Sequence, residues 1–547
     1  MRSTSFSAFR ILALVVFVNF ASMTKSFGET NYSLEGKRPP HFAGVWYEAN
    51  PEQLNTQLSE YLKNADNEMA LHPIEPSFAD NQACTPNIVA AIVPHAAYYY
   101  SGQTAAFAYE KLNGLKVDRI FLLGPSHYTA FRGCALPTDS IFATPLGDLQ
   151  VDQEVIKELC HFPSFKQMPD VHTQEHALEL QLPLIRKIFG DVRIVPITVG
   201  NLSDETDIRQ VGRILKRYMH KGDLVIVSSD FTHYGPRYDF QPFKDNIPQN
   251  IRKLDEDAFK CLGQPDLKAF LDFHDRTHDT ICGFYPCAVL LSMLPAQAHA
   301  SLLSYHTSRE LLDDPDNNSV SYMAIVFSCP ESSEGWGSAT EATGESAGAL
   351  TAADGKKLLE IARLALRSHV LQTAKPADYS KLLSPHQQAL FNQHRGVFVT
   401  LFKHHVGENP VSERKDGKNL RGCIGYIWPV KSLLESVCDN VVSAATRDHR
   451  FDPVSADELK DLQIEVSVLT PPHGVKSWQD IKLGQDGIVM HKHGLQAVFL
   501  PSVASEFGWD LPETLTQLSI KAGCGPDGWK KDTVFDVFQV QSFEESE

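Results

Sequence analysis

Short apolar runs alternate with amphipathic segments along the first half of the chain. The amphipathic segments GQTAAFAYEKL (102–112) and DIRQVGRILKRYM (207–219) place apolar side chains at helical spacing. The apolar runs, each about the length of one strand, are NIVAAIV (87–93), RIFLL (119–123), RIVPITV (193–199) and DLVIVS (223–228). Because continuous apolar runs suit strands covered on both faces, the pattern predicts an α/β domain with a mainly parallel sheet.

Histidines come shortly after three of these runs. His95 and His127 follow two of the runs, and Asp230 and His233 follow a third. In an open α/β sheet, functional groups collect outside the carboxyl ends of the strands. A single histidine there is more often structural than a ligand, but three at equivalent strand ends favour a bound metal ion, since imidazole is the commonest metal ligand.

Cys282 is a further candidate ligand or nucleophile. It lies just before the apolar run Cys287–Leu294, which has the look of a helix. The positive end of a helix lowers the pKa of a nearby thiol, so we expect Cys282 to favour the thiolate form. The alternative is an inert buried cysteine, and Cys287 fits that description better.

The segment Thr173–Ile185, with sequence TQEHALELQLPLI, is predicted to form one helix. Its first turn carries Glu175 and His176, and Glu179 lies one turn further on the same side as Glu175. These carboxylates are positioned to accept hydrogen bonds from the N–H groups of metal-bound imidazoles. A solvated acidic face explains the spacing equally well.

Composition changes sharply between Glu331 and Gly355, where Gly, Ser, Ala, Thr and Glu replace the apolar periodicity. Such a segment cannot bury enough apolar surface to order itself, so we predict a flexible linker over 331–355. Beyond it, residues 355–371 have a helical apolar stripe and GVFVTLFK (396–403) alternates like a strand. We therefore predict one domain over 28–330 and a second over 356–547.

The first 27 residues differ from the rest of the chain. Arg2 and Arg10 accompany the uncharged apolar run Ile11–Ala21, which is shorter than the ~20 residues of a transmembrane helix and suits a signal peptide. We predict a signal peptide over 1–27 and an exported or periplasmic protein, with a cytoplasmic location if the signal is not real. No stable membrane span is expected after signal removal.

Charge and cysteine content narrow the function classes. The 67 acidic and 50 basic side chains give a formal net charge of −17, which repels a phosphate backbone, so no nucleic-acid partner is expected. The ten cysteines include no C-x-x-C pair, which argues against a zinc-finger array or a dense disulfide framework.

Six separated motifs resemble the MEMO family, in the family's order, over about 39–327. They are PHAAYYYSG, LLGPSHY, EHALELQLPLI, SSDFTHYG, DTICGFYPCAVLL and SVSYMAIVF. The resemblance implies a fold similar to the class III extradiol dioxygenases, the LigB-like α/β sandwich, with a non-haem iron at the strand ends. The chain departs from the family pattern at Ala97, where glycine is common, and at Phe284-Tyr285-Pro286, where an Arg-His-Pro sequence is common.

The same resemblance assigns roles by position. It implies metal ligands at His95, His127 and Cys282, with Asp230 and His233 beside the pocket as catalytic groups. Glu175 and His176 match a further family motif. Tyr98 is a candidate for lining the pocket, although packing at the exit of a strand is the better explanation for at least two of the three tyrosines at 98–100. Two histidines and a thiolate suit a transition metal, with iron preferred over copper or zinc.

The second half resembles the AMMECR1 family over about 351–543. The specific motif is NLRGCIG (419–425), which holds the signature residues Arg421, Gly422, Cys423 and Gly425. The resemblance implies a compact α+β domain. Cys423 beside Arg421 is either an activated thiol or part of a tight structural turn.

Prokaryotic relatives of these two families are linked with a radical S-adenosylmethionine protein in the AmmeMemoRadiSam system, which implies that protein as a partner. This chain has no Cys-x-x-x-Cys-x-x-Cys motif of its own. We expect a metal-dependent redox or modifying protein acting on a small molecule or peptide. The alternatives are a metal-stabilised binding module without turnover, and a hydrolase with Cys282 as nucleophile and His233 as base.

Overall fold

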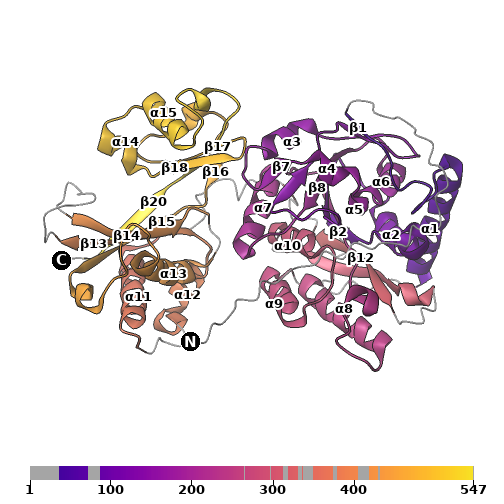
Figure 1. The fold of residues 1–547 in the computed structure, drawn as a ribbon, viewed down its shortest axis with the longest axis horizontal. Helices are drawn as coiled ribbons and strands as arrows, with labels where there is room; N and C mark the ends of the chain where they lie inside the picture. The colour runs from indigo at the N-terminus through magenta and orange to yellow at the C-terminus, as the bar shows by residue number, and fades with distance from the viewer. Residues whose placement is uncertain are drawn as a thin grey trace, which may run out of the picture. The chain divides into compact units, whose positions relative to one another are not determined.

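The computed structural model divides into two compact units near Ser338 (Figure 1). None of the helices described in it is both long and apolar enough to cross a membrane. The predicted signal peptide and most of the predicted linker lie outside the described residues. The structure describes residues 36–71, 87–263, 265–295, 297–311, 318–330, 336, 349–373, 379–404, 418–428 and 431–545.

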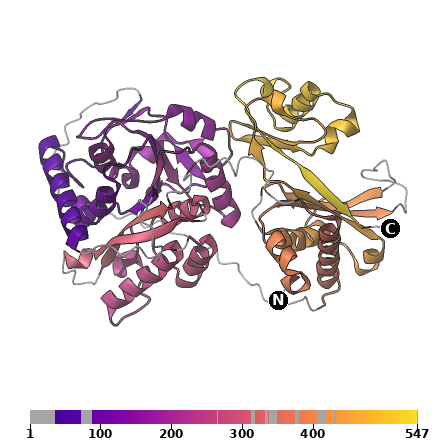
Figure 2. The same cartoon turned by 180° about the vertical axis from the view of Figure 1, so that it is seen from behind.

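A nine-stranded mixed sheet forms the centre of the N-terminal unit (Figure 2). Its strands are β2 (Asn87–Val93), β3 (Arg119–Pro125), β4 (Cys134–Leu136), β7 (Phe165–Gln167), β8 (Arg193–Val199), β9 (Asp223–Ser228), β10 (His233–Tyr234), β11 (His299–Thr307) and β12 (Ser319–Cys329). The order is β10-β12-β2-β9-β3-β8-β4-β7, with β11 also paired to β12. A second, three-stranded sheet contains β1 (Lys37–Arg38), β5 (Ile141–Phe142) and β6 (Leu149–Gln150).

The apolar runs of the sequence form the parallel centre of the large sheet. Strands β2, β9, β3 and β8 are neighbours and run parallel, as predicted. Every residue of β3 is buried, so both of its faces are covered. The neighbours β12 and β4 run antiparallel to this centre. Because the four strands are parallel, their carboxyl ends lie at one edge of the sheet, where the candidate histidines follow.

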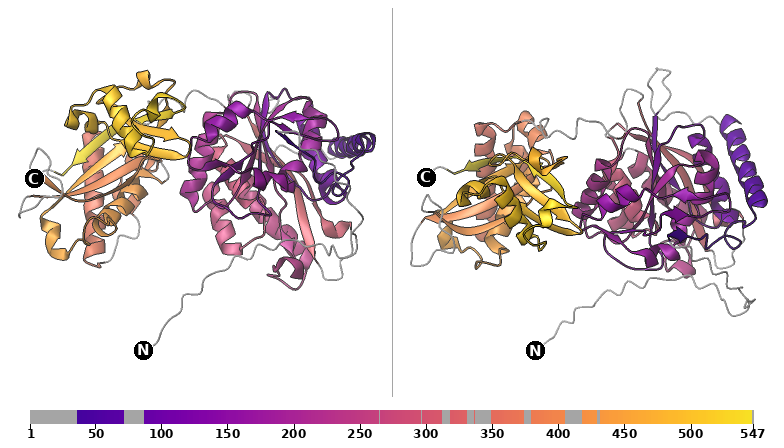
Figure 3. Two further views of the ribbon diagram at one scale, coloured as in Figure 1. Left: turned by 45° about the horizontal axis from the view of Figure 1, so that its top comes forward. Right: turned by 90° about the horizontal axis from the view of Figure 1, so that it is seen from above.

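Helices cover this sheet. They are α1 (Pro51–Leu71), α2 (Tyr98–Leu112), α3 (Gln153–Leu159), α4 (Pro169–Thr173), α5 (His176–Glu179), α6 (Leu182–Phe189), α7 (Glu205–Arg217), α8 (Ile247–Gly263), α9 (Leu267–Thr277) and α10 (Phe284–Met293). Helix α2 packs against β2 and β12, and α10 packs against β3 and β9. Helix α1 packs on α2 at the outside of the unit (Figure 3). The tyrosines at 98–100 form the first turn of α2 rather than a strand exit.

The prediction of one helix over Thr173–Ile185 is wrong, because the segment is divided among α4, α5 and α6. Pro183 lies at the start of α6 and has no N–H to continue a helix that began at His176. The Arg38 guanidinium also opposes a continuous helix after α4. It donates hydrogen bonds to the main-chain oxygens of His172 (2.7 Å) and Glu175 (3.1 Å), which in a continuous helix would accept main-chain N–H groups.

A buried ion pair holds the N-terminal segment on this broken helix. Arg38 Nη1 lies 2.7 Å from Glu179 Oε2, and both side chains are almost fully buried. Glu179 also accepts hydrogen bonds from the main-chain N–H of Phe42 (2.7 Å) and from the Tyr47 hydroxyl (2.9 Å). Burial, reinforced by the Glu179 charge, raises the pKa of Tyr47. Glu179 is therefore a structural anchor and not an acceptor for a metal-bound imidazole.

The C-terminal unit contains two four-stranded antiparallel sheets. One sheet, in the order β14-β13-β15-β20, consists of β13 (Gly396–His404), β14 (Lys418–Tyr426), β15 (Leu462–Leu469) and β20 (Val540–Glu544). The other, in the order β16-β19-β17-β18, consists of β16 (His473–Gly474), β17 (Gly487–Lys492), β18 (Leu495–Phe499) and β19 (Val534–Phe538). The antiparallel sheets agree with the predicted α+β class.

Helices pack against one face of the first of these sheets. The helices of the unit are α11 (Ala352–Val370), α12 (Pro385–Phe391), α13 (Leu433–Thr446), α14 (Ser502–Phe507) and α15 (Leu511–Lys521). Helix α11 contacts β15 and β20, α13 contacts β13 and β14, and their apolar faces share one buried core with the sheet.

The described ends of the predicted linker belong to the two units. Trp336 is buried, and its indole N–H donates to the main-chain oxygen of Val89 at 2.9 Å. Helix α11 begins at Ala352, where Thr351 and Asp354 form a capping box. Helix α11 therefore begins inside the segment predicted as a linker, because Thr351 and Asp354 supply a capping signal within a linker-like composition.

Replacing Glu179 with Gln should destabilise the N-terminal unit, because the buried Arg38 charge would lose its counter-ion. We expect the free energy of unfolding to fall by about 3 kcal/mol, as for other broken buried ion pairs. Urea unfolding of the full chain, followed by circular dichroism, measures this change. Glu68→Gln, on an exposed position of α1, is the matched control and should shift stability by less than about 0.5 kcal/mol. Equal unfolding midpoints for the two variants would contradict the anchor role.

Candidate metal centre

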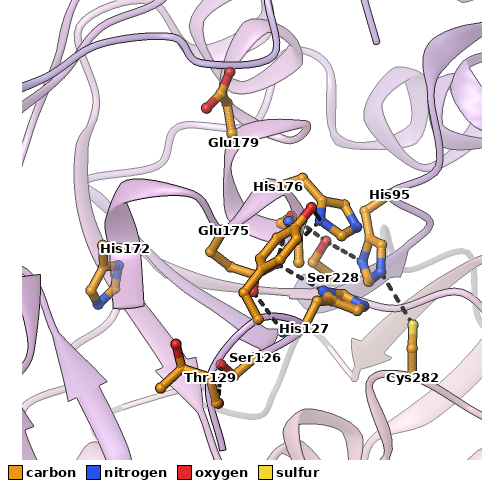
Figure 4. Close-up of polar contacts among 12 residues, drawn as sticks. His95, Ser126, His127, Thr129, His172, Glu175, His176, Glu179, Ser228 and Cys282 are labelled. Atoms are coloured by element: carbon orange, nitrogen blue, oxygen red, sulfur yellow. Dashed lines mark hydrogen bonds and ion pairs between the residues drawn. The ribbon is translucent and has the colours of Figure 1, made fainter. Parts of the chain in front are cut away.

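Three side chains that are far apart in the sequence converge at the carboxyl edge of the parallel strands (Figure 4). His95 follows β2, His127 follows β3, and Cys282 lies in the loop before α10. Their ligand atoms all lie within 4.8 Å of one another. The Cys282 sulfur is 3.2 Å from His95 Nε2, and the two imidazole centroids are 5.0 Å apart. The structure thus brings together the three residues predicted as metal ligands.

The tautomer of His95 follows from its neighbours. Ser228 Oγ donates its hydrogen to the main-chain oxygen of Ala177 at 2.6 Å. It must therefore act as an acceptor toward His95 Nδ1, which lies 2.9 Å away. Nδ1 then carries the hydrogen, and Nε2 presents a lone pair on the side of Cys282. Burial lowers the pKa of His95 well below its ordinary value, which favours this neutral form.

Glu175 orients His127 in the same way. Its carboxylate lies 2.8 Å from His127 Nδ1 and also accepts the main-chain N–H of His127 at 2.7 Å. Although burial opposes a charged imidazole, the adjacent Glu175 charge raises the pKa of His127 above its ordinary value. Burial likewise opposes the carboxylate, but the contacts with His127 lower the pKa of Glu175. This is the carboxylate–histidine arrangement that orients imidazoles in metal sites, and the sequence predicted it for Glu175.

His176 is the third imidazole of the cluster. Its ring centroid lies 4.2 Å from that of His127 and 5.4 Å from that of His95. His127, Glu175 and His176 also form a second group whose ligand atoms lie within 4.8 Å of one another. Burial, and then the charges of the other two histidines, lower the pKa of His176 well below its ordinary value. A neutral His176 beside the three predicted ligands offers a further nitrogen lone pair to a cation without adding positive charge.

His233 and Asp230 lie beside this cluster. His233 Nδ1 faces the main-chain oxygens of Phe231 (2.8 Å) and Thr280 (3.0 Å), so Nδ1 carries the hydrogen and Nε2 has a free lone pair. Asp230 accepts the main-chain N–H of His95 at 2.8 Å. Burial raises the pKa of Asp230 and lowers that of His233. His233 can accept a proton, while Asp230 holds the main chain that carries His95.

The expectation that the pKa of the Cys282 thiol is lowered is wrong. Burial, and then the neighbouring Asp230 charge, raise the pKa of Cys282 well above its ordinary value. The helix starts at Phe284, but its partial charge does not offset the loss of solvent. The sulfur accepts the main-chain N–H of Asp230 at 3.1 Å and contacts His95. Only a cation at the site would compensate a thiolate here.

Several supporting residues were not predicted from the sequence. Ser228, at the end of β9, and Gln181, whose amide donates to Ser228 at 2.9 Å, hold His95 from behind. Trp46 packs on His176 with a centroid distance of 4.5 Å, and the Tyr128 hydroxyl lies 3.3 Å from His176 Nδ1. The sequence Ser-Ser-Asp (228–230), which places polar residues at the end of a predicted strand, was a usable signal for Ser228. Nothing in the periodicity points to Trp46.

Tyr98, predicted as a pocket residue, is buried away from the ligand atoms. Its hydroxyl donates to the main-chain oxygen of Leu180 at 2.7 Å, and its ring contacts that of Tyr47. It packs the start of α2 against the loop between α5 and α6. Tyr98 therefore supports the segment that carries His176 and Glu175, because its hydroxyl donates to the main chain of Leu180 and not to a candidate ligand atom.

The AMMECR1 signature forms part of strand β14 rather than a turn. A side chain at Gly422 would place its Cβ 2.1 Å from the main-chain oxygen of Ala444, and one at Gly425 would lie 2.4 Å from that of Val397. Both glycines are therefore required by close backbone approach. Arg421 forms two hydrogen bonds with Glu458, at 2.9 and 3.0 Å.

Cys423 does not have the features of an activated thiol. Burial raises its pKa, although a hydrogen bond from the Thr400 hydroxyl at 3.4 Å and the Arg450 charge oppose the increase. Its main-chain N–H donates to Asp448 at 2.8 Å, and Asp448 is paired with Arg450. Because the Asp448 and Arg450 charges pair with each other, the contacts of the signature region stabilise the fold and do not activate the Cys423 thiol.

The α/β fold and the histidine–cysteine cluster define a class of protein with a candidate transition-metal site. The donor set of imidazole nitrogens and one sulfur suits iron, copper or zinc better than magnesium or calcium. In the comparisons, the model of Memo-like proteins matches residues 38–326, and the AMMECR1 model matches residues 359–543. This chain belongs to the family of Memo-like proteins and carries an AMMECR1 domain after the Memo-like domain.

Two relatives agree with the Memo-like assignment. The Caenorhabditis elegans protein memo-1 homolog is 35% identical over 306 residues, which are 54% of this chain and 80% of that protein. Human protein MEMO1 is 32% identical over 302 residues, which are 52% of this chain and 96% of that protein. A solved structure of an uncharacterized protein from Pyrococcus horikoshii is 32% identical and covers 36% of this chain and 94% of its own, with a TM-score of 0.31.

Replacing Glu175 with Gln should weaken metal binding, because the amide is a poorer acceptor for the His127 N–H and removes its partner charge. We expect a 10- to 100-fold loss of affinity, as is typical for about one lost supporting hydrogen bond to a ligand histidine. Competition with a chromophoric chelator measures it. Glu154→Gln, at an exposed position of α3, is the control. Unchanged affinity in Glu175→Gln would show that the carboxylate does not support the ligand.

Proposed function

We propose that the protein is a metal-dependent redox or modifying enzyme, with its reaction centre in the N-terminal unit. The observation that supports this most strongly is the convergence of His95, His127 and Cys282, with Nδ1 of each imidazole held by a buried oxygen atom, of Ser228 for His95 and of Glu175 for His127. The proposed fold type is that of the class III extradiol dioxygenases.

His95, His127 and Cys282 would hold the metal, and iron is the preferred candidate, with copper and zinc as alternatives. The metal would supply a Lewis acid with open positions and, for iron or copper, access to redox change. The residues present fit such an ion, since the buried Cys282 sulfur needs a cation to become a thiolate. His176 lies close enough to His95 and His127 to affect how tightly the site would bind the metal.

His233 is the proposed acid–base residue. Its Nε2 lone pair is free because Nδ1 is held by two main-chain oxygens, and burial keeps the ring neutral by lowering its pKa. Such a ring can accept a proton from a bound hydroxyl or water group and return it later. Asp230 acts by holding His95 and by its charge on His233.

Purified full-length protein should hold about one transition metal per chain, and His127→Ala should reduce this to near zero, since about three protein ligands are needed for such a site. Metal analysis of anaerobically purified protein measures both. His220→Ala removes an exposed histidine of the same unit and should keep the metal. Full stoichiometry in His127→Ala would contradict the ligand assignment.

Turnover separates an enzyme from a binding module. We expect iron-loaded protein to consume oxygen with at least one catechol-type compound, and His233→Ala to keep its metal but lose most of this activity, by about 100-fold or more for a lost general base. An oxygen electrode measures the rate. The same rate in His233→Ala and in His220→Ala would remove His233 from the mechanism, even if the metal site is real.

A further inference from the structure

The ring of His233 is oriented by main-chain groups. Its Nδ1 faces the main-chain oxygens of Phe231 at 2.8 Å and of Thr280 at 3.0 Å. The Thr280 hydroxyl also accepts the main-chain N–H of His233 at 2.8 Å and donates to the main-chain oxygen of His233 at 3.0 Å. Because both ring contacts are made to carbonyl groups, the direction of Nε2 depends on the conformation of residues 231–233 and of Thr280.

Thr232, the residue between Phe231 and His233, is held by a buried carboxylate of helix α8. Its main-chain N–H donates to Asp255 Oδ1 at 3.2 Å, and its hydroxyl donates to the same oxygen at 2.6 Å. Thr232 and Asp255 are each 1% exposed. Hydrogen bonds to an ionised acceptor are stronger than those to a neutral one, so Asp255 restrains both the main chain and the side chain of Thr232.

Strand β12 holds the same segment through other groups. The main-chain N–H of Phe231 donates to the main-chain oxygen of Ser321 at 2.9 Å, and the Ser321 N–H donates to the main-chain oxygen of Thr232 at 3.0 Å. Strand β10, which begins at His233, then pairs with β12 in antiparallel orientation. The N–H of Thr232 has its acceptor on α8 instead, so Asp255 supplies a hold on the segment that is separate from the sheet.

The second oxygen of Asp255 has a different partner. The Tyr305 hydroxyl, on strand β11, donates to Asp255 Oδ2 at 3.0 Å, and α8 packs against β11. Burial raises the pKa of Asp255 to about 6, although the hydrogen bonds from Ser321, Thr232 and Tyr305 lower it. Because Oδ1 serves Thr232 and Oδ2 serves Tyr305, variants can address the two contacts separately.

We infer that Asp255 is a positioning residue that holds the His233 imidazole with Nε2 available for proton transfer, and that it acts through Thr232. The contacts connect the two residues in steps: Asp255 fixes Thr232, Thr232 fixes the adjoining Phe231 carbonyl, and this carbonyl receives Nδ1 of His233. The inference rests on the proposed function, which gives His233 its acid–base role. It adds a residue on a separate helix that decides the orientation of this base.

The tautomer of His233 tests this inference without depending on turnover. The full chain is loaded with zinc, which is diamagnetic, and its histidine side chains, labelled with nitrogen-15, are observed by long-range proton–nitrogen NMR. The measurement is made at about pH 8, above the pKa of Asp255, so that the carboxylate is ionised. The signals of His233 are identified by their loss in His233→Ala. In the unaltered protein we expect the form with the hydrogen on Nδ1.

Two variants remove the hold on Thr232, and two matched variants keep it. Thr232→Val removes the hydroxyl donor, and Asp255→Leu removes both acceptor oxygens. Thr232→Ser keeps the hydroxyl, and Tyr305→Phe removes only the donor to the other carboxylate oxygen. In the first two, the ratio of the Nδ1–H to the Nε2–H form should fall by about threefold or more, since one hydrogen bond is worth about that ratio. In the matched variants the ratio should stay within about twofold of that in the unaltered protein.

A kinetic measurement connects the orientation of His233 with proton transfer. With iron-loaded protein and a catechol-type compound in the oxygen electrode, Thr232→Val should lower kcat by about tenfold or more and change KM by less than about twofold, because a misplaced base affects the chemical step and not binding. Thr232→Ser should keep at least about half of the kcat of the unaltered protein. The metal content should be equal in all forms, since none of the substitutions replaces a candidate ligand.

The outcomes separate this inference from the proposed function. An unchanged tautomer ratio in Thr232→Val overturns the inference, whether or not Asp255→Leu folds. An equally large change in Tyr305→Phe also overturns it, because general loosening around α8 would then explain the effect. A changed ratio with an unchanged kcat in Thr232→Val overturns the role in proton transfer. If the ratio changes as expected but the unaltered protein oxidises no catechol-type compound, the proposed function fails, while the hold of Asp255 on the His233 ring is supported.

Discussion

Side chains that are to meet at one cation must each present a lone pair toward it, so each must be held from its other side. In the N-terminal unit this holding is done by buried oxygen atoms. Ser228 accepts from His95 because its own hydrogen is committed to Ala177, and Glu175 accepts from His127. The geometry of the site therefore depends on these hydrogen bonds as much as on the ligand residues.

The main chain that carries Glu175 is in turn held by a part of the chain that is remote in sequence. Arg38 donates to the main-chain oxygens of His172 and Glu175 and forms a buried ion pair with Glu179. The segment that carries Phe42 and Trp46 is attached to the Glu179 carboxylate, which accepts hydrogen bonds from the Phe42 main-chain N–H and the Tyr47 hydroxyl. One buried charge pair thus fixes both the support of His127 and the aromatic side chains that contact His176.

The two units differ in how their polar signatures are satisfied. In the C-terminal unit, Arg421 pairs with Glu458 and Arg450 pairs with Asp448, so the charges are used within the fold. In the N-terminal unit, the ligand atoms of His95, His127 and Cys282 lie within 4.8 Å of one another. This difference is the physical reason for placing the proposed chemistry in the Memo-like unit.

Much of this protein could be predicted from the sequence. Its periodicity determined the parallel strands, because four apolar runs can be buried only inside a covered sheet. It also determined that His95, His127 and His233 lie at one edge, since parallel strands end on the same side.

Other features were decided only by the tertiary structure. The break of the helix at Pro183, the capture of Glu179 by Arg38 and the raised pKa of Cys282 all depend on groups that are distant in sequence. A local pattern carries the spacing of side chains, but it does not carry the desolvation and the partners that a side chain acquires when remote segments pack around it.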